Sequence, residues 1–184
     1  MHHASHYTVE ITNQRAAKDE FFRTSHHSPI PDADRPSFTG LAYYAVDPTL
    51  RFEGLHLQPY AGAAPAEFLI STSDNQSRSA KRLGHLTFQV NGEDRSLVAY
   101  ALGATDGSLF VPFLDATSGT ETYGAGRYLD LHPEPDATYV LDFNEAYQPY
   151  CTYSPYFSCP LTPAENRLPD RIEAGERMRD EDAH

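Results

Sequence analysis

Residues 109–160 read LFVPFLDATSGTETYGAGRYLDLHPEPDATYVLDFNEAYQPYCTYSPYFSCP, and this stretch predicts both the fold class and the region of a site. Its apolar segments are short and are separated by turns rich in Gly, Pro, Asp and Asn, a pattern typical of β-strands. Seven of the twelve tyrosines and both cysteines lie in it. It also holds more polar residues than loops alone require, so we expect any functional site here.

The strand pattern continues on the N-terminal side of this stretch. Short apolar or alternating segments occupy 40–46, 50–59, 67–72, 81–90 and 96–102. The Asn91-Gly92 pair between the last two segments predicts a tight β-hairpin. This rhythm predicts a mainly β (α+β) fold, a single-domain antiparallel β-barrel or sandwich with an N-terminal helix and a short C-terminal helix.

The chain is expected to form one domain over residues 1–184, because its length is typical of a single core. The N-terminal helix is predicted over 8–24 and the β core over 39–143. Residues 144–179 are expected to form a Tyr- and Pro-rich coil that ends in a short helix over 171–179. The ends, 1–7 and 180–184, are expected to be flexible.

The composition excludes several classes of partner. The formal net charge is −12, and only two lysines accompany twelve arginines. This balance argues against binding to nucleic acid or to an anionic membrane surface, which both require clustered cations. No apolar run is long enough to span a bilayer, and the first residues, MHHASHYTVE, lack the apolar core of a signal peptide. We therefore expect a cytoplasmic protein, and the sequence predicts no oligomeric state.

Several motifs together resemble a known family. They include Phe110-Val111-Pro112-Phe113, Thr117-Ser118-Gly119, Gly126-Arg127-Tyr128, Asp142-Phe143-Asn144, Pro149-Tyr150-Cys151 and Glu165-Asn166-Arg167-Leu168. With further matches from Arg15 to Glu176, the chain resembles the prokaryotic family of unknown function DUF1684. The resemblance implies no activity, because that family is uncharacterised. One departure is Asn75, where Gly is expected after Thr72-Ser73-Asp74, and Asn also tolerates a left-handed turn.

The candidate ligand-binding residues are polar side chains at strand ends. Arg127 offers a planar cation for a carboxylate or phosphate, and the loop that follows Asp115 is rich in backbone N–H groups. Asp142 and Asn144, two residues apart on a strand end, face the same side. The full candidate set is Asp115, Ser118, Arg127, Tyr128, Asp142, Asn144 and Tyr147.

Two interpretations of this set stay open, and a third is ranked below them. In the first, residues 113–147 build a pocket for a small polar or anionic molecule, with or without catalysis. In the second, the same residues form a satisfied buried polar network in a non-catalytic module that binds a protein partner. The third is a flavin-binding split barrel. It ranks low because Arg127 is the only basic residue that could bind the flavin phosphate. No cofactor is predicted.

Cys151 and Cys159 are eight residues apart, which is not the spacing of a zinc or thioredoxin motif. They are interpreted as buried free thiols, as a disulfide that closes a short loop, or, least favoured, as groups with metal or redox chemistry. No metal site is predicted, since a site at these cysteines would need two further ligands.

Overall fold

The computed structural model describes residues 2–103 and 106–179, with side chains from His6 onward. A single α-helix in this part of the chain, α1 (His2–Thr24), precedes the strands. It confirms the predicted N-terminal helix but begins at His2 rather than at residue 8. Residues 2–7 thus form its first turns, while Met1 and residues 180–184, also predicted to be flexible, lie outside the described residues.

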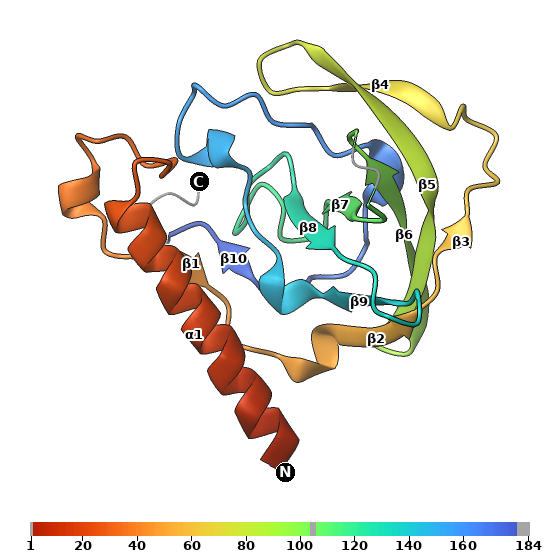
Figure 1. The fold of residues 1–184 in the computed structure, drawn as a ribbon, viewed down its shortest axis with the longest axis horizontal. Coiled ribbons are helices and arrows are strands. Elements are labelled where there is room, and N and C mark those ends of the chain that lie inside the picture. The colour runs from red at the N-terminus through yellow and green to blue at the C-terminus, as the bar shows by residue number, and fades with distance from the viewer. Residues whose placement is uncertain (1, 104–105, 180–184) are drawn as a thin grey trace.

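Six antiparallel strands form the main sheet, which curves from β3, β4 and β5 on the right-hand side of the molecule to β7 and β8 near its middle (Figure 1). They are β3 (Gln58–Pro59), β4 (Glu67–Ser71), β5 (Ser77–Val90), β6 (Glu93–Ala101), β7 (Leu109–Phe113) and β8 (Arg127–Leu131). The order is β3-β5-β6-β7-β8, and β4 also pairs with β5. The predicted hairpin is confirmed, because Asn91 (φ 53°) and Gly92 (φ 80°) connect β5 and β6.

A two-stranded pair covers the main sheet and completes the core. β2 (Arg51–Leu55) pairs with β9 (Tyr139–Asp142). Aromatic rings join the two layers, with ring centroids 5.1 Å apart for Phe52 and Phe88 and 5.6 Å apart for Phe88 and Phe143. Such edge-to-face and tilted contacts add specific packing to the burial of apolar surface.

The mainly β class is confirmed, but of the two predicted architectures, a barrel or a sandwich, the barrel is wrong. The sheet is open, with β3 and β4 along one side and β8 at the other. Closure is prevented because the outer edge of β8 is bonded to coil: Tyr128 N donates to Tyr147 O over 2.8 Å, and Tyr147 N donates back over 3.1 Å. The coil that follows β9 therefore occupies the edge that a barrel would pair with β3 or β4.

The predicted short C-terminal helix is also wrong. Residues 171–179 are extended and contain β10 (Glu176–Arg177), which pairs with β1 (Ala42–Tyr43). Side chains hold this segment extended by bonding its backbone, as described below. Gly175 (φ 76°) turns the chain just before β10, in a conformation that other residues adopt only at a cost. A single 3-10 turn, Ala164–Asn166, is the helical structure nearest to the predicted element.

Helix α1 lies along the outside of the strands (Figure 1). Its buried Phe22 packs against Tyr150 and Tyr153, with centroid distances of 5.8 and 5.6 Å. Asp19 accepts a hydrogen bond from Leu41 N over 2.9 Å, which fixes the connector that leads to β1. Within the described part of the chain, this helix and the shorter turns are too polar or too short to cross a bilayer.

A candidate anion-binding cavity beside β10

The candidate residues Asp115 and Arg127 form a buried ion pair. Arg127 begins β8 and is 1% exposed, and its Nη2 lies 3.5 Å from Asp115 Oδ2. Its guanidinium also donates to the carbonyls of Ile172 (2.8 Å), Glu176 (3.1 Å) and Ala174. Burial lowers the pKa of Arg127 and Asp115 opposes that shift, but an arginine so paired remains charged.

Asp115 completes this network on its other side. Its carboxylate accepts hydrogen bonds from Thr117 Oγ1 (2.8 Å), Ser118 Oγ (3.2 Å) and the backbone N–H of Ile172 (2.7 Å). Ser118 therefore closes the 115–118 turn. Together, Asp115 and Arg127 hold residues 172–176 in their extended path, which brings β10 to its position.

Asp142 and Asn144 form a second network with different partners. Asp142 accepts hydrogen bonds from Tyr7 Oη (2.6 Å) and Asn144 N (2.9 Å), and Arg51 Nε lies 3.3 Å away. The Asn144 side chain accepts from Asp47 N (2.7 Å) and donates to Asp47 O (2.8 Å). This network connects α1, β2 and the segment that follows β1.

The remaining candidates, Tyr128 and Tyr147, line a cleft of about 430 Å³ that we call the aromatic cleft. Their rings meet edge to face with centroids 5.7 Å apart. Tyr147 Oη donates to Asp130, and Lys18 Nζ lies 5.0 Å from the centroid of the Tyr147 ring. The lining residues are Lys18, Tyr128, Asp130, Tyr147, Pro149, Tyr150, Phe157 and Cys159.

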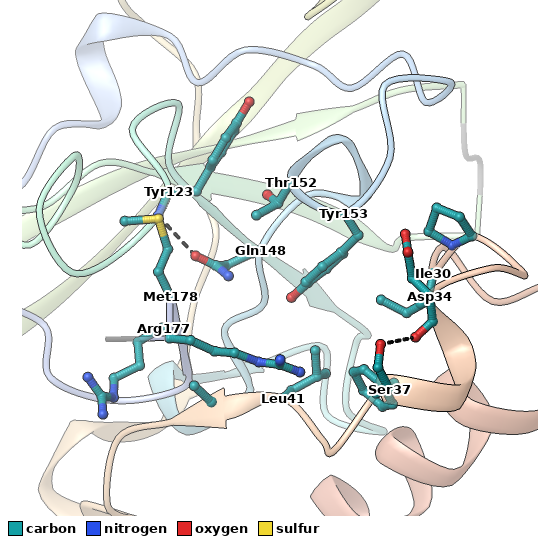
Figure 2. A pocket seen from close by; sticks show the side chains of 14 residues that line it. Ile30, Asp34, Ser37, Leu41, Tyr123, Gln148, Thr152, Tyr153, Arg177 and Met178 are labelled. Atoms are coloured by element: carbon teal, nitrogen blue, oxygen red, sulfur yellow. Dashed lines mark hydrogen bonds between the residues drawn. The ribbon is translucent and has the colours of Figure 1, made fainter. Parts of the chain in front are cut away.

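A larger cavity of about 580 Å³, which we call the β10 cavity, lies beside β10. Its walls come from the connector before β1, the loop at Tyr123, the coil after β9 and the end of β10 (Figure 2). The lining residues are Ile30, Pro31, Asp34, Ser37, Phe38, Leu41, Ala42, Tyr123, Gln148, Thr152, Tyr153, Arg177, Met178 and Arg179.

The β10 cavity has a cationic side. Arg177 and Arg179 stand against a single carboxylate in the lining, Asp34, although the whole chain is strongly acidic. Arg179 Nη2 donates to Gly40 O over 2.8 Å, and its guanidinium lies 5.7 Å from the centroid of the Phe38 ring. Arg177 also lies near Glu121, whose pKa is lowered mainly by Arg171 and Tyr44 and to a smaller extent by Arg177.

Polar groups form another part of the cavity lining. Figure 2 shows Gln148 between Tyr123 and Tyr153, with Thr152 close by. Gln148 is 3% exposed, and its Oε1 accepts a hydrogen bond from Tyr123 N over 3.0 Å, which fixes the amide. Thr152 Oγ1 is buried and has no hydrogen-bond partner among the described residues. Burial, followed by a hydrogen bond with Cys151, raises the pKa of Tyr123 to about 12, so its hydroxyl is neutral at pH 7.

The wall that carries the arginines is firmly held. Glu176 N donates to Ala146 O and Met178 N donates to Glu121 O, both over 2.8 Å. The Glu176 carboxylate is 1% exposed and accepts from Gln148 N (2.8 Å), Tyr153 Oη (3.2 Å) and Lys18. Arg127 binds the carbonyl of the same residue. The predicted residues Asp115 and Arg127 therefore lie behind the cavity wall. Within the lining, Tyr123 comes from residues 109–160, where a functional site was expected.

Sequence reasoning missed the residues that give the cavity its charge. Arg177 and Arg179 directly follow Glu176, the last of the matches on which the family resemblance rests, and neither belongs to the predicted candidate set. The sequence feature that could have drawn attention to this segment is Gly175. A Cβ there would lie 2.5 Å from Ala146 O, so the glycine marks close packing beside the site. Among the described residues, no group of three or more His, Cys, Asp or Glu side chains is arranged to hold a metal ion.

Comparison with known proteins identifies the family. The model of the family described as "Protein of unknown function (DUF1684)" matches residues 36–177, which include every strand of the structure. The chain belongs to the DUF1684 family. This DUF1684 protein is also similar to an uncharacterized protein of Haloarcula marismortui solved by solution NMR. The two are 37% identical, the match covers 96% of this chain and 97% of that one, and the TM-score is 0.69. No curated protein matches the chain.

Proposed function

We propose that this DUF1684 protein binds a small anionic molecule in the β10 cavity. The observation that carries the proposal is the pair Arg177 and Arg179 in the lining of a cavity of about 580 Å³, in a chain whose net charge is −12. Guanidinium groups bind carboxylates and phosphates through charge-assisted hydrogen bonds. The volume falls within the range of small-molecule pockets.

The rest of the lining supports a ligand with a planar polar body. Tyr123, Tyr153 and Phe38 supply ring surfaces, and Gln148 and Thr152 supply an amide and a hydroxyl. A buried hydroxyl without a partner costs free energy in the folded protein, and a bound polar group can recover part of it. A carboxylate or phosphate attached to a ring would meet both kinds of surface.

Within this proposal the predicted residues position the cavity. Asp115, Ser118 and Arg127 hold the segment that leads into β10, and Asp142 and Asn144 hold the chain after β1, the strand that pairs with β10. The polar networks favour the interpretation of these residues as structural. The proposed anion site is therefore formed by Arg177 and Arg179 beside these residues, and not by the predicted residues themselves. Tyr128 and Tyr147 belong to the separate aromatic cleft.

A thermal-shift screen tests the proposal. The panel contains mono- and dicarboxylates, phosphate monoesters, nucleotides and aromatic acids. A ligand at a hundredfold its Kd adds about 2.7 kcal/mol to the free energy of unfolding. For a chain of this length that corresponds to a rise in Tm of roughly 5–10 °C.

The arginine variants decide where such a ligand binds. The double variant R177Q/R179Q should lose the shift while the free protein still melts cooperatively. R23Q is the control, because Arg23 lies on α1 and pairs with the exposed Glu20. A shift that persists in R177Q/R179Q, or a panel without any hit, would contradict the proposal and favour a module that binds a protein partner.

A further inference from the structure

Cys151 and Cys159 are neighbours in space, and both are free thiols. Cys151 N donates a hydrogen bond to Cys159 Sγ over 3.3 Å. The Cys159 sulfur therefore lies against the backbone of Cys151 and brings the two ends of the short 151–159 loop together, although the spacing matches no redox motif.

The pair lies between the aromatic cleft and the β10 cavity. Cys159 is 8% exposed and belongs to the lining of the aromatic cleft. Cys151 is half-buried, and its thiol lies 3.7 Å from the hydroxyl oxygen of Tyr123, a wall residue of the β10 cavity. A small reagent can thus reach the half-buried Cys151, and a change at this thiol alters its contact with Tyr123 in the cavity wall.

The backbone holds the two thiols in place. Ser73 brackets Cys159, because Ser73 N donates to Cys159 O (2.8 Å) and Cys159 N donates to Ser73 Oγ (3.0 Å). Cys151 lies in the 3-10 turn Tyr150–Thr152, closed by the hydrogen bond from Thr152 N to Pro149 O (2.9 Å). Anchoring both ends keeps the effective concentration of one thiol near the other high.

We propose that Cys151 and Cys159 form a reversible disulfide by exchange with a small disulfide of the glutathione class. The thiolate of the more exposed Cys151 attacks one sulfur of the reagent, whose S–S bond breaks and releases one small thiol. The thiolate of Cys159 then attacks Cys151 Sγ in the mixed disulfide and releases the second small thiol. Two electrons pass to the reagent, and the two thiol protons end on the small thiols.

The order of attack follows from the surroundings of the two thiols. Burial raises the pKa of Cys159 to about 11, so little of it is thiolate near neutral pH. Cys159 is therefore the resolving group, and its proximity to Cys151 offsets its small fraction of thiolate. In a reducing compartment such a disulfide forms transiently and responds to the redox state. It does not stabilise the fold permanently.

Mass spectrometry of the full chain tests the inference. The reduced protein is incubated natively with oxidised glutathione, denatured, alkylated and digested with trypsin. One tryptic peptide, 128–167, contains both cysteines of the chain. We expect this peptide to lose two hydrogen atoms and take up no alkyl group, and to take up two alkyl groups after reduction.

Single-cysteine variants separate the two steps. C159S retains Cys151 and should stop at the mixed disulfide, with one glutathione attached. C151S retains the buried Cys159 and should react much more slowly, by at least tenfold. Two alkylatable thiols in the treated wild-type protein would overturn the inference. So would two attached glutathiones, or a dimer linked between chains. None of these wild-type results depends on the folding of a variant.

Discussion

Replacing Arg127 with methionine removes the guanidinium but keeps most of the apolar side chain. Three backbone carbonyls of the segment before and within β10 then lose their donor, and Asp115, itself 1% exposed, loses its cation. Breaking a buried ion pair by removing one partner costs about 3–5 kcal/mol. That is a large part of the 5–15 kcal/mol that holds a typical domain folded. R127M should therefore unfold at a much lower urea concentration than the wild-type protein.

Two further variants make this result specific. R23M removes an arginine whose ion pair with Glu20 is exposed, and it should change the free energy of unfolding by about 1 kcal/mol or less. Adding D115N to R127M should recover part of the loss, because it removes the uncompensated buried carboxylate. A loss below about 1 kcal/mol in R127M, with urea dependence unchanged, would refute the claim that this network holds β10 in place.

Three other predictions concern the walls of the β10 cavity. G175A should destabilise the protein by about 1–3 kcal/mol in urea unfolding, because Gly175 combines φ 76° with a Cβ position 2.5 Å from Ala146 O. G54A, at φ 66° with open space, should cost less; equal costs would show that the contact with Ala146 O is unimportant. Tyr123 has a folded-state pKa of about 12 against an ordinary 10.0, so its contribution to stability is complete below pH 10 and is lost as the pH rises toward 12. Y123F should lose less stability than the wild-type protein between about pH 10 and 12, and parallel curves would contradict this. T152V should leave the Tm of the free protein unchanged or raised, because the Thr152 hydroxyl has no described partner, and should reduce the Tm shift caused by a bound anion.

The parts of the fold that depend on local rules were predictable from the sequence. Asn91-Gly92 forms its hairpin because both residues accept positive φ. Asn75, predicted to tolerate a left-handed turn in place of Gly, has φ 61°. These features need only neighbouring residues, so the sequence carries them directly.

Barrel closure and the C-terminal helix depend on distant contacts, and there the predictions were wrong. Whether β8 pairs with another strand depends on Tyr147, which bonds its edge from the coil. Residues 171–179 contain good helix formers, but Arg127 and Asp115 bond their backbone and draw them into an extended path. The helix propensity of this segment is small compared with such buried contacts.

The candidate site was predicted at the level of a region rather than of its charged residues. Strand-end Asp, Asn and Arg residues fit a ligand site and a structural network equally well in sequence, because burial distinguishes the two and sequence does not report it. Arg177 and Arg179 become noticeable only when β10 pairs with β1 and their side chains line the same cavity as Gln148.

The most direct test of the central claim is a ¹H–¹⁵N NMR titration of the full chain with the anion that gives the largest thermal shift. The proposal predicts that the side-chain N–H signals of Arg177, Arg179 and Gln148 move together and saturate with a single Kd. The signal of Arg23, outside the cavity, should remain in place. Saturable shifts around Lys18 and the aromatic cleft, with the arginine signals unmoved, would contradict the proposal.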